Sequence, residues 1–203
     1  MDYWAREGPT EYEIANVFQE TPSTTFVTIS RAAAAWVNQV ALQSFFEDAP
    51  LLGTVDADPD FNPDNFDGSK QVRWDLMRLP IYEGMRVGFT ANVIPEIDYV
   101  NGMEGHVVMM DHTGVLIKTT TGRMVKVAKY THKQWRYRYH PIRIAYATTL
   151  MKVQGDTLKH MTLWMDVPGV EAAGYVALSR VQHDKDWSYV GFLKPSHFIP
   201  AQL

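Results

Sequence analysis

Residues 145–180 constrain the fold of this chain more than any other stretch, because they place a buried strand, a polar loop and a helix in close succession. The loop contains Gly155, and the helix consists of small residues and ends in a single arginine, Arg180. A main-chain amide at a glycine and an arginine at a helix end are groups with which proteins hold phosphate. The stretch therefore predicts a phosphate site, for which most of the remaining chain is a scaffold.

The composition is typical of a globular chain. Its 203 residues are 46% hydrophobic, which suffices for one sizeable core or for a domain with an insertion. No apolar run approaches the roughly 20 residues that span a bilayer, and the N-terminal residues lack the layout of a signal peptide. The absence of cysteine excludes disulfides, thiolate zinc sites and a cysteine nucleophile.

Charge is distributed unevenly along the chain. Residues 1–80 contain thirteen acidic and five basic residues, whereas residues 81–203 contain ten acidic and fourteen basic residues. Residues 112–155 hold nine Lys and Arg and no Asp or Glu. Such a run is either a solvated face or a track for a polyanion, because cations spaced along a surface release counterions from a nucleic acid backbone.

Residues 1–79 are predicted to form the first part of an α/β domain. Thr10 and Glu13 have the spacing of a capping box, which opens a helix of about ten residues. The β-branched residues 24–30 predict a strand, and a helix over residues 31–46 follows at once.

An acidic segment, residues 53–70, interrupts this pattern. Its alternating acids invite comparison with a calcium-binding loop. However, Phe61 or Asn65 occupies the position of the required glycine in the two possible frames, and neither frame has the terminal glutamate. We therefore interpret the segment as a solvated loop.

Residues 80–133 are predicted to form a small, mainly antiparallel β-barrel insertion. Short strands follow one another closely there, with turn signals between them at Asn-Gly 101–102 and Thr-Gly 121–122. Aromatic and basic side chains then alternate, as on a half-buried strand. Its Arg136 and Arg138 either point into solvent beside an aromatic core face or contact phosphates while an aromatic ring stacks on a base.

Residues 134–203 are predicted to complete the α/β domain. Strands are expected over residues 142–149, in a buried central position, and over residues 161–167 and 187–193. A helix is expected over residues 170–181. The pattern predicts one α/β domain with a barrel-like insert.

Two late motifs resemble the C-terminal region of superfamily-one DNA helicases of the PIF/RecD type. Residues 147–158 read ATTLMKVQGDTL, and residues 175–180 read YVALSR. Weaker similarity extends to the barrel residues 84–105, to residues 141–145 and 191–195, and to Ile29-Ser30-Arg31 with Asn38 behind it. The resemblance covers most of the chain from residue 24 onward, and it implies a second RecA-like domain with a small β-barrel insertion.

The resemblance also implies roles for individual residues. In such helicases ATP lies between two RecA-like domains, so Arg180 would be the arginine finger that reaches the γ-phosphate. Gln154 and Gly155 would sense the same phosphate, and Arg31 is also expected at the nucleotide. Single-stranded DNA would be contacted by four residues: Thr149, Lys152, Arg136 and Arg138.

The chain departs from the family pattern in two ways. Met151 and Val153 stand where the family has histidine and serine, and methionine cannot donate a hydrogen bond as histidine does. No Gly-x-x-x-x-Gly-Lys-Ser/Thr motif occurs in the chain. The phosphate cradle and the Mg²⁺ ligands are therefore expected on an N-terminal RecA-like domain, a partner in cis or in trans, and this chain alone is not expected to hold ATP.

Three functions remain open from the sequence. The chain is the C-terminal motor part of an ATP-dependent DNA helicase, inactive as an ATPase alone; or it is a non-catalytic module that binds single-stranded nucleic acid; or it is a degenerate helicase remnant. The resemblance implies an intracellular protein, in the nucleus or mitochondrion if it is eukaryotic and in the cytoplasm if it is bacterial or viral, with no membrane partner.

Overall fold

The computed structural model of the protein describes residues 8–57, 78–92, 101–131 and 138–199. These residues belong to two compact units. The discontinuous unit comprises Met1–Glu47 and Tyr146–Leu203, and the inserted unit comprises Asp48–Ala145. Within the described ranges, no helix is both long and apolar enough to cross a membrane.

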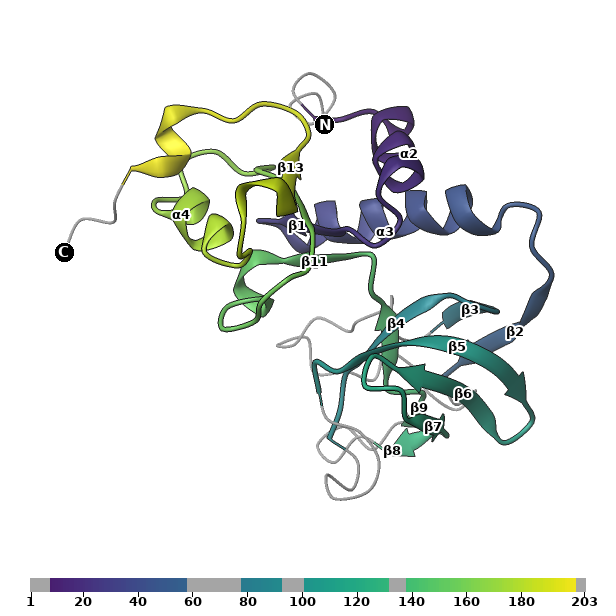
Figure 1. Cartoon of the computed structure of the whole chain (residues 1–203). Coiled ribbons are helices and arrows are strands. Elements are labelled where there is room, and N and C mark those ends of the chain that lie inside the picture. The colour runs from purple at the N-terminus through teal and green to yellow at the C-terminus, as the bar shows by residue number, and fades with distance from the viewer. Residues whose placement is uncertain (1–7, 58–77, 93–100, 132–137, 200–203) are drawn as a thin grey trace, which may run out of the picture. The chain divides into compact units, whose positions relative to one another are not determined.

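A parallel sheet of four strands forms the centre of the discontinuous unit (Figure 1). In spatial order the strands are β11 (Ala147–Thr149), β1 (Thr25–Thr28), β12 (Met161–Trp164) and β13 (Trp187–Tyr189). Both central strands, β1 and β12, are buried along their whole length, as expected where helices cover both faces of a sheet. The predicted α/β class with a parallel sheet is confirmed.

Two helices of this unit begin at the caps that the sequence predicts. At the start of α2 (Glu11–Glu20), the Glu13 N–H donates to Thr10 Oγ1 over 3.2 Å, and the Thr10 N–H donates to the Glu13 carboxylate over 2.7 Å. This pair is the predicted capping box. The helix α3 (Arg31–Phe46) begins at Ser30, whose hydroxyl caps its first turn. Both helices therefore start where their free N–H groups find acceptors.

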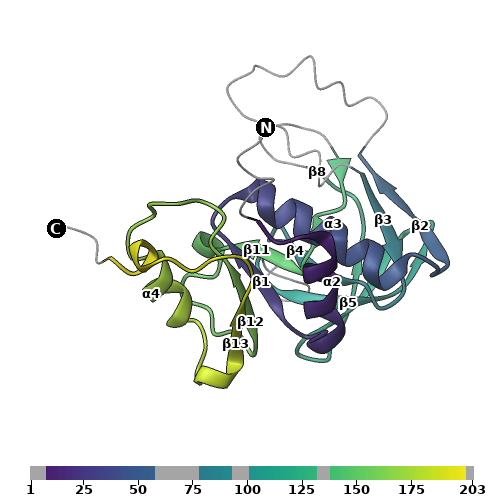
Figure 2. The same cartoon turned by 90° about the horizontal axis from the view of Figure 1, so that it is seen from above.

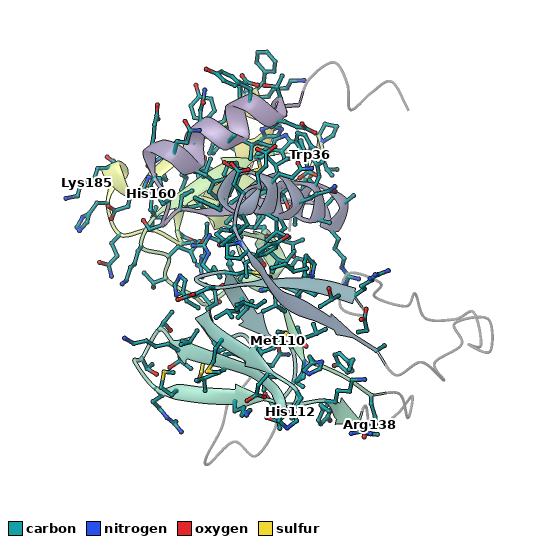
Figure 3. All side chains as sticks on the ribbon, turned by 90° about the vertical axis from the view of Figure 1, so that its right-hand side faces the viewer. Trp36, Met110, His112, Arg138, His160 and Lys185 are labelled. Carbon is teal, nitrogen blue, oxygen red and sulfur yellow. The ribbon has the colours of Figure 1, made fainter. Side chains whose placement is uncertain are left out.

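Neighbouring residues of β1 show that helices cover opposite faces of the sheet. Phe26 packs against Phe18 of α2, with ring centroids 4.9 Å apart. Val27 joins a different apolar cluster, which includes Ala177 of α4 (Ala173–Leu178). Because successive side chains of a strand point to opposite faces, α2 and α4 lie on opposite sides, as Figure 2 shows. On the α3 side, Trp36, labelled in Figure 3, meets Trp164 edge to face, with ring centroids 5.5 Å apart.

The helix α4 is shorter than predicted. The sequence predicted a helix over residues 170–181, but Ala172 adopts φ 56°, so helical geometry starts only at Ala173. The helix is held from outside by η5 (Pro195–Phe198): the Phe198 ring lies so close to Gly174 that a Cβ there would be 2.4 Å from its Cε1 atom. Only glycine allows this approach.

The inserted unit consists of antiparallel strands. Five of them pair in the order β10-β4-β5-β6-β7, while β2 pairs with β3 and β8 pairs with β9. The predicted insertion, residues 80–133, falls within this unit. The strands are β2 (Leu51–Asp56), β3 (Arg78–Tyr82), β4 (Arg86–Phe89), β5 (Glu104–Asp111), β6 (Gly114–Thr119), β7 (Met124–Val127), β8 (Tyr130–Thr131), β9 (Arg138–Tyr139) and β10 (Ile142–Ile144).

Two local predictions are wrong. The solvated loop was expected to begin at residue 53, but β2 continues to Asp56, because its residues pair antiparallel with those of β3. One central strand was expected over residues 142–149, but two strands occupy it. β10 pairs with β4 in the inserted unit, and β11 is the edge of the parallel sheet.

Candidate functional site

The strand β11 leads into the candidate site, and Asn38 of α3 fixes where it starts. The Asn38 Oδ1 atom accepts hydrogen bonds from the N–H groups of Tyr146 and Ala147, both over 2.9 Å. The Asn38 side-chain amide donates to the Ala147 oxygen over 3.1 Å. The Asn38 side chain thus satisfies main-chain groups at the start of β11 that no further strand of the described residues pairs with. An edge strand needs such partners for its backbone groups.

The loop after β11 is anchored by apolar residues and presents polar ones. Leu150 of η3 (Leu150–Lys152) and Val153 are buried in the cluster beneath α4. Met151 is 80% exposed. Helicases of the PIF/RecD type have serine at the position of Val153. In this chain the valine is buried and packs in the apolar cluster beneath α4. The loop therefore keeps a fixed base while its tip faces solvent.

Four predicted site residues lie in this loop. Thr149 is half-buried at the end of β11, whereas Lys152, Gln154 and Gly155 are exposed. Gly155 has φ +93°, and nothing lies within 4 Å of the place where a Cβ would stand. The glycine is thus required by its backbone conformation and not by crowding.

Arg180 follows the last turn of α4 and is partly exposed. Its Nε donates to the Val176 oxygen over 3.2 Å, and its Nη2 donates to Ser179 Oγ over 2.8 Å. Ser179 Oγ in turn donates to the Val176 oxygen over 2.8 Å. The guanidinium is therefore folded back on its own helix, where it interacts favourably with the carbonyl groups of the helix C-terminus.

The structure brings the two motifs together through the backbone. The Leu158 N–H, three residues after Gly155, donates to the Arg180 oxygen over 2.7 Å. Leu158 and Leu178 are both packed against the same apolar cluster. The loop that carries Gln154 and Gly155 is thus joined to the turn that carries Arg180, as a phosphate site built from both would require.

Arg31 is positioned by another part of the sheet. It is exposed at the first position of α3, directly after β1. The neighbouring N–H groups of Ile29 and Ser30 donate to the buried carboxylate of Asp166, at 2.6 Å to Ile29 and 3.1–3.2 Å to Ser30. Asp166 therefore joins the ends of β12 and β1. The sequence offered no signal for it, since its partners are 136 and 137 positions away.

The predicted basic strand is described only in part. Arg138 is exposed on β9 (Figure 3). Tyr139 beside it is 4% exposed. The Tyr139 ring meets Tyr130 of β8 at 6.2 Å. Arg136 lies outside the described residues. Arg138 and Tyr139 therefore follow the predicted alternation of exposed basic and buried aromatic side chains.

Among the residues that the structure describes, no three His, Asp or Glu side chains gather as they would around a metal ion. Two of the predicted phosphate-contacting elements, the Gly155 loop and Arg180, are joined by the Leu158–Arg180 backbone hydrogen bond and supply an amide and a guanidinium. Both bind anions and neither binds Mg²⁺.

Comparison with known proteins identifies a curated relative and several solved structures of similar fold. No family model matches the chain. A curated relative, the ATP-dependent DNA helicase Pif1 of Bdellovibrio bacteriovorus, is 33% identical in an alignment over 136 residues, and the alignment covers 62% of this chain and 30% of that protein. The chain therefore spans about a third of this relative's length.

Solved Pif1 structures share the fold. Pif1 from Bacteroides in complex with ADP-AlF3 and ssDNA has a TM-score of 0.68 and 20% identity, over 88% of this chain and 42% of that one. Pif1 from Candida albicans has a TM-score of 0.66 and 17% identity, over 91% of this chain and 48% of that one. The predicted resemblance to the C-terminal region of Pif1-type helicases is therefore confirmed, in sequence by the Bdellovibrio relative and in fold by the solved structures.

Proposed function

We propose that this chain forms the C-terminal motor part of an ATP-dependent DNA helicase and contributes half of a nucleotide site. The observation that carries the proposal is the 2.7 Å hydrogen bond from the Leu158 N–H to the Arg180 oxygen, which joins the Gly155 loop to the arginine. The sequence similarity to an ATP-dependent DNA helicase supports the same assignment. The other half of the site belongs to a RecA-like domain with a phosphate loop.

Arg180 acts as the arginine finger in this proposal. Its present hydrogen bonds to Val176 and Ser179 are made to uncharged oxygens, and the side chain is partly exposed. A phosphate offers stronger, bidentate and charge-assisted hydrogen bonds, so the guanidinium exchanges its helix contacts for the γ-phosphate when a nucleotide arrives. In other phosphoryl-transfer systems, such a finger accelerates the reaction by about 10³–10⁵-fold.

Gln154 and Gly155 report the state of the same phosphate. Both are exposed, and the positive φ of Gly155 sets the direction of the loop backbone. Because Val153 is buried beneath α4, a movement of this tip is transmitted to the apolar cluster that also holds Ala177. ATP with Mg²⁺ is bound only together with the partner domain, since the Mg²⁺ ligands belong to it.

Single-stranded DNA is contacted by the other end of the same loop. Thr149 and the exposed Lys152 lie five and two positions before Gln154, so that one segment of seven residues, 149–155, touches both DNA and nucleotide. Met151, at 80% exposure, meets sugar or base faces and not phosphate, because a thioether packs on apolar surfaces. Arg138, and Arg136 before it in the sequence, add cationic contacts from the inserted unit.

Reconstitution tests this proposal. The chain is mixed with the separately produced first RecA-like domain of a Pif1-type helicase and oligo-dT, and phosphate release from ATP is measured. We expect no turnover by the chain alone, turnover by the mixture, and its loss with Arg180→Ala but not with Lys185→Ala, which removes an exposed cation nearby. Hydrolysis by the chain alone that Arg180→Ala abolishes would refute the need for a partner domain.

A further inference from the structure

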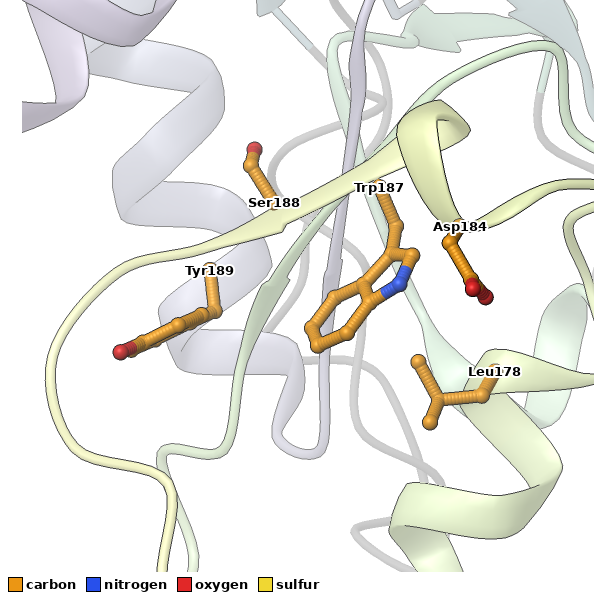
Figure 4. A pocket seen from close by; sticks show the side chains of 5 residues that line it. All are labelled: Leu178, Asp184, Trp187, Ser188 and Tyr189. Carbon is orange, nitrogen blue, oxygen red and sulfur yellow. The ribbon is translucent and has the colours of Figure 1, made fainter.

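An open pocket of about 460 Å³ lies beside α4 and has no part in the proposed nucleotide site. It is lined by Leu178, Asp184, Trp187, Ser188 and Tyr189 (Figure 4). The rings of Trp187 and Tyr189 are 6.3 Å apart and inclined by 33°. Tyr189 is 54% exposed, and the Asp184 carboxylate lies on the other side of the Trp187 ring. The pocket thus combines two aromatic surfaces with one carboxylate.

This combination favours a cation. Aromatic faces are electronegative and attract a guanidinium or an ammonium group, and a carboxylate completes the charge pairing. The carboxylate of Asp184 repels phosphate, which argues against a nucleotide as the occupant. A guanidinium fits better than an ammonium, because it stacks flat on an aromatic ring and presents paired N–H donors to a carboxylate.

On this side, no strand of the described residues pairs with the backbone of β13. Among the described residues, β13 is the last strand of the parallel sheet. The Val190 N–H donates to the Leu163 oxygen over 3.1 Å, so the main-chain groups of Ser188 and Val190 point toward β12. By the alternation of a strand, the N–H and C=O groups of Trp187 and Tyr189 point to the open edge. Trp187 and Tyr189 thus provide both the aromatic rings of the pocket and the outward-pointing main-chain groups of the strand.

The hydroxyl of Ser188 is directed elsewhere. It is bonded to the Thr162 hydroxyl at 3.0 Å, and Thr162 is bonded to Thr24 at 2.8 Å. These contacts hold β13 to β12 through side chains as well as backbone, and they hold β12 to Thr24, the residue before β1. The strand edge is therefore a fixed template, as strand addition requires.

We propose that β13 and this pocket form a docking site for an extended, arginine-containing segment of a partner protein. The segment pairs its backbone with the outward groups of Trp187 and Tyr189, in the manner of an added β-strand. One arginine of the segment enters the pocket, stacks on the two rings and pairs with Asp184. Neither Arg180 nor Gly155 lines the pocket. The docking site can therefore be tested independently of the proposed helicase function.

Fluorescence anisotropy tests this proposal with the labelled peptide Thr-Val-Arg-Val-Thr, in which the two valines flank the arginine on the opposite strand face. A second peptide carries citrulline, the neutral isostere, in place of arginine. We expect Asp184→Asn to raise Kd at least about fivefold for the arginine peptide and to leave the citrulline peptide unchanged. Tyr189→Ser should weaken both peptides, and circular dichroism confirms that each variant is folded.

Asp186→Asn is the matched control, because it removes the same charge two residues away and Asp186 does not line the pocket. Equal losses with Asp184→Asn and Asp186→Asn would mean a diffuse charge effect and would overturn the site. Equal binding of the two peptides to the wild-type chain, or no binding of either, would overturn it as well. Displacement of the peptide by AMP, independent of Asp184, would assign the pocket to a nucleobase instead.

Discussion

The main-chain N–H of Leu158 donates a 2.7 Å hydrogen bond to the main-chain oxygen of Arg180. This bond crosses from the segment after Gly155 to the turn that ends α4. Leu158 and Leu178 pack against the same apolar cluster, and this packing holds the two bonded segments in place. In the function proposed above, this bond is the physical link through which a change at the Gly155 loop would reach Arg180.

Leu158→Pro removes the donor of this bond. We expect the free energy of unfolding to fall by about 1–3 kcal/mol, because the Arg180 oxygen loses its partner and the apolar contact is disturbed. Leu158→Ala keeps the N–H and serves as the control for lost packing. Urea unfolding followed by tryptophan fluorescence measures both variants. Equal losses would show that the hydrogen bond itself contributes nothing.

Gly174→Ala places a methyl group where the Phe198 ring now lies, 2.4 Å from its nearest atom. We expect the residues of η5 to detach from α4, at a cost of about 1–3 kcal/mol in unfolding free energy. The double variant Gly174→Ala with Phe198→Leu makes room for the methyl group and should regain most of the loss. Proteolysis of the C-terminal segment reports the detachment. A double variant no more stable than Gly174→Ala alone would contradict this explanation.

The inserted unit should lose stability in mild acid because of His140. Burial lowers the pKa of His140 to about 4, with a further contribution from Lys129, while Asp56 opposes the shift. The folded pKa lies below the unfolded value of about 6.5, so the stabilisation is complete above pH 6.5 and is lost as the pH falls toward 4. The loss amounts to at most about 3 kcal/mol.

Hydrogen exchange of the β5–β7 amides between pH 7 and pH 4, corrected for intrinsic rates, measures this loss. His140→Gln should flatten the profile. His106 has a pKa that is lowered by burial and by Arg86, so His106→Gln should flatten it less. An unchanged profile in His140→Gln would assign the acid sensitivity to other groups.

Binding of oligo-dT should depend on salt through individual cations. Lys152→Ala and Arg138→Ala are each expected to reduce the slope of log K against log salt by about 0.7, the value for one phosphate contact on a single strand. Lys185→Ala is the control, since this lysine lies on η4 (Asp184–Asp186) beside acidic residues. A slope that changes equally in all three variants would point to net charge and not to a defined DNA path.

The parts of the fold that the sequence predicted are those set by local chemistry. The capping box of Thr10 and Glu13, the cap at Ser30 and the β6–β7 hairpin around Gly122 each depend on residues close in sequence. The division of residues 142–149 into β10 and β11 depends on partners far away, and so it was missed. A periodic apolar run does not reveal that its two halves pair in different sheets.

The candidate site was predictable to a similar extent. Its residues were found through motifs, and the structure adds what holds them: Asn38 at the start of β11, Asp166 at the ends of β12 and β1, and Val153 beneath the loop. Asp166 and Asn38 act over more than a hundred positions of sequence. Such partners follow from the tertiary fold, which no local pattern encodes.

The central claim is that Arg180 acts across a domain boundary on a nucleotide that this chain does not hold alone. The most direct test is single-turnover ATP cleavage in the mixture of this chain with a first RecA-like domain, at saturating nucleotide and oligo-dT. Arg180→Ala should slow cleavage by about 10³-fold or more while ATP binding changes little. Cleavage at the wild-type rate by Arg180→Ala would contradict the account.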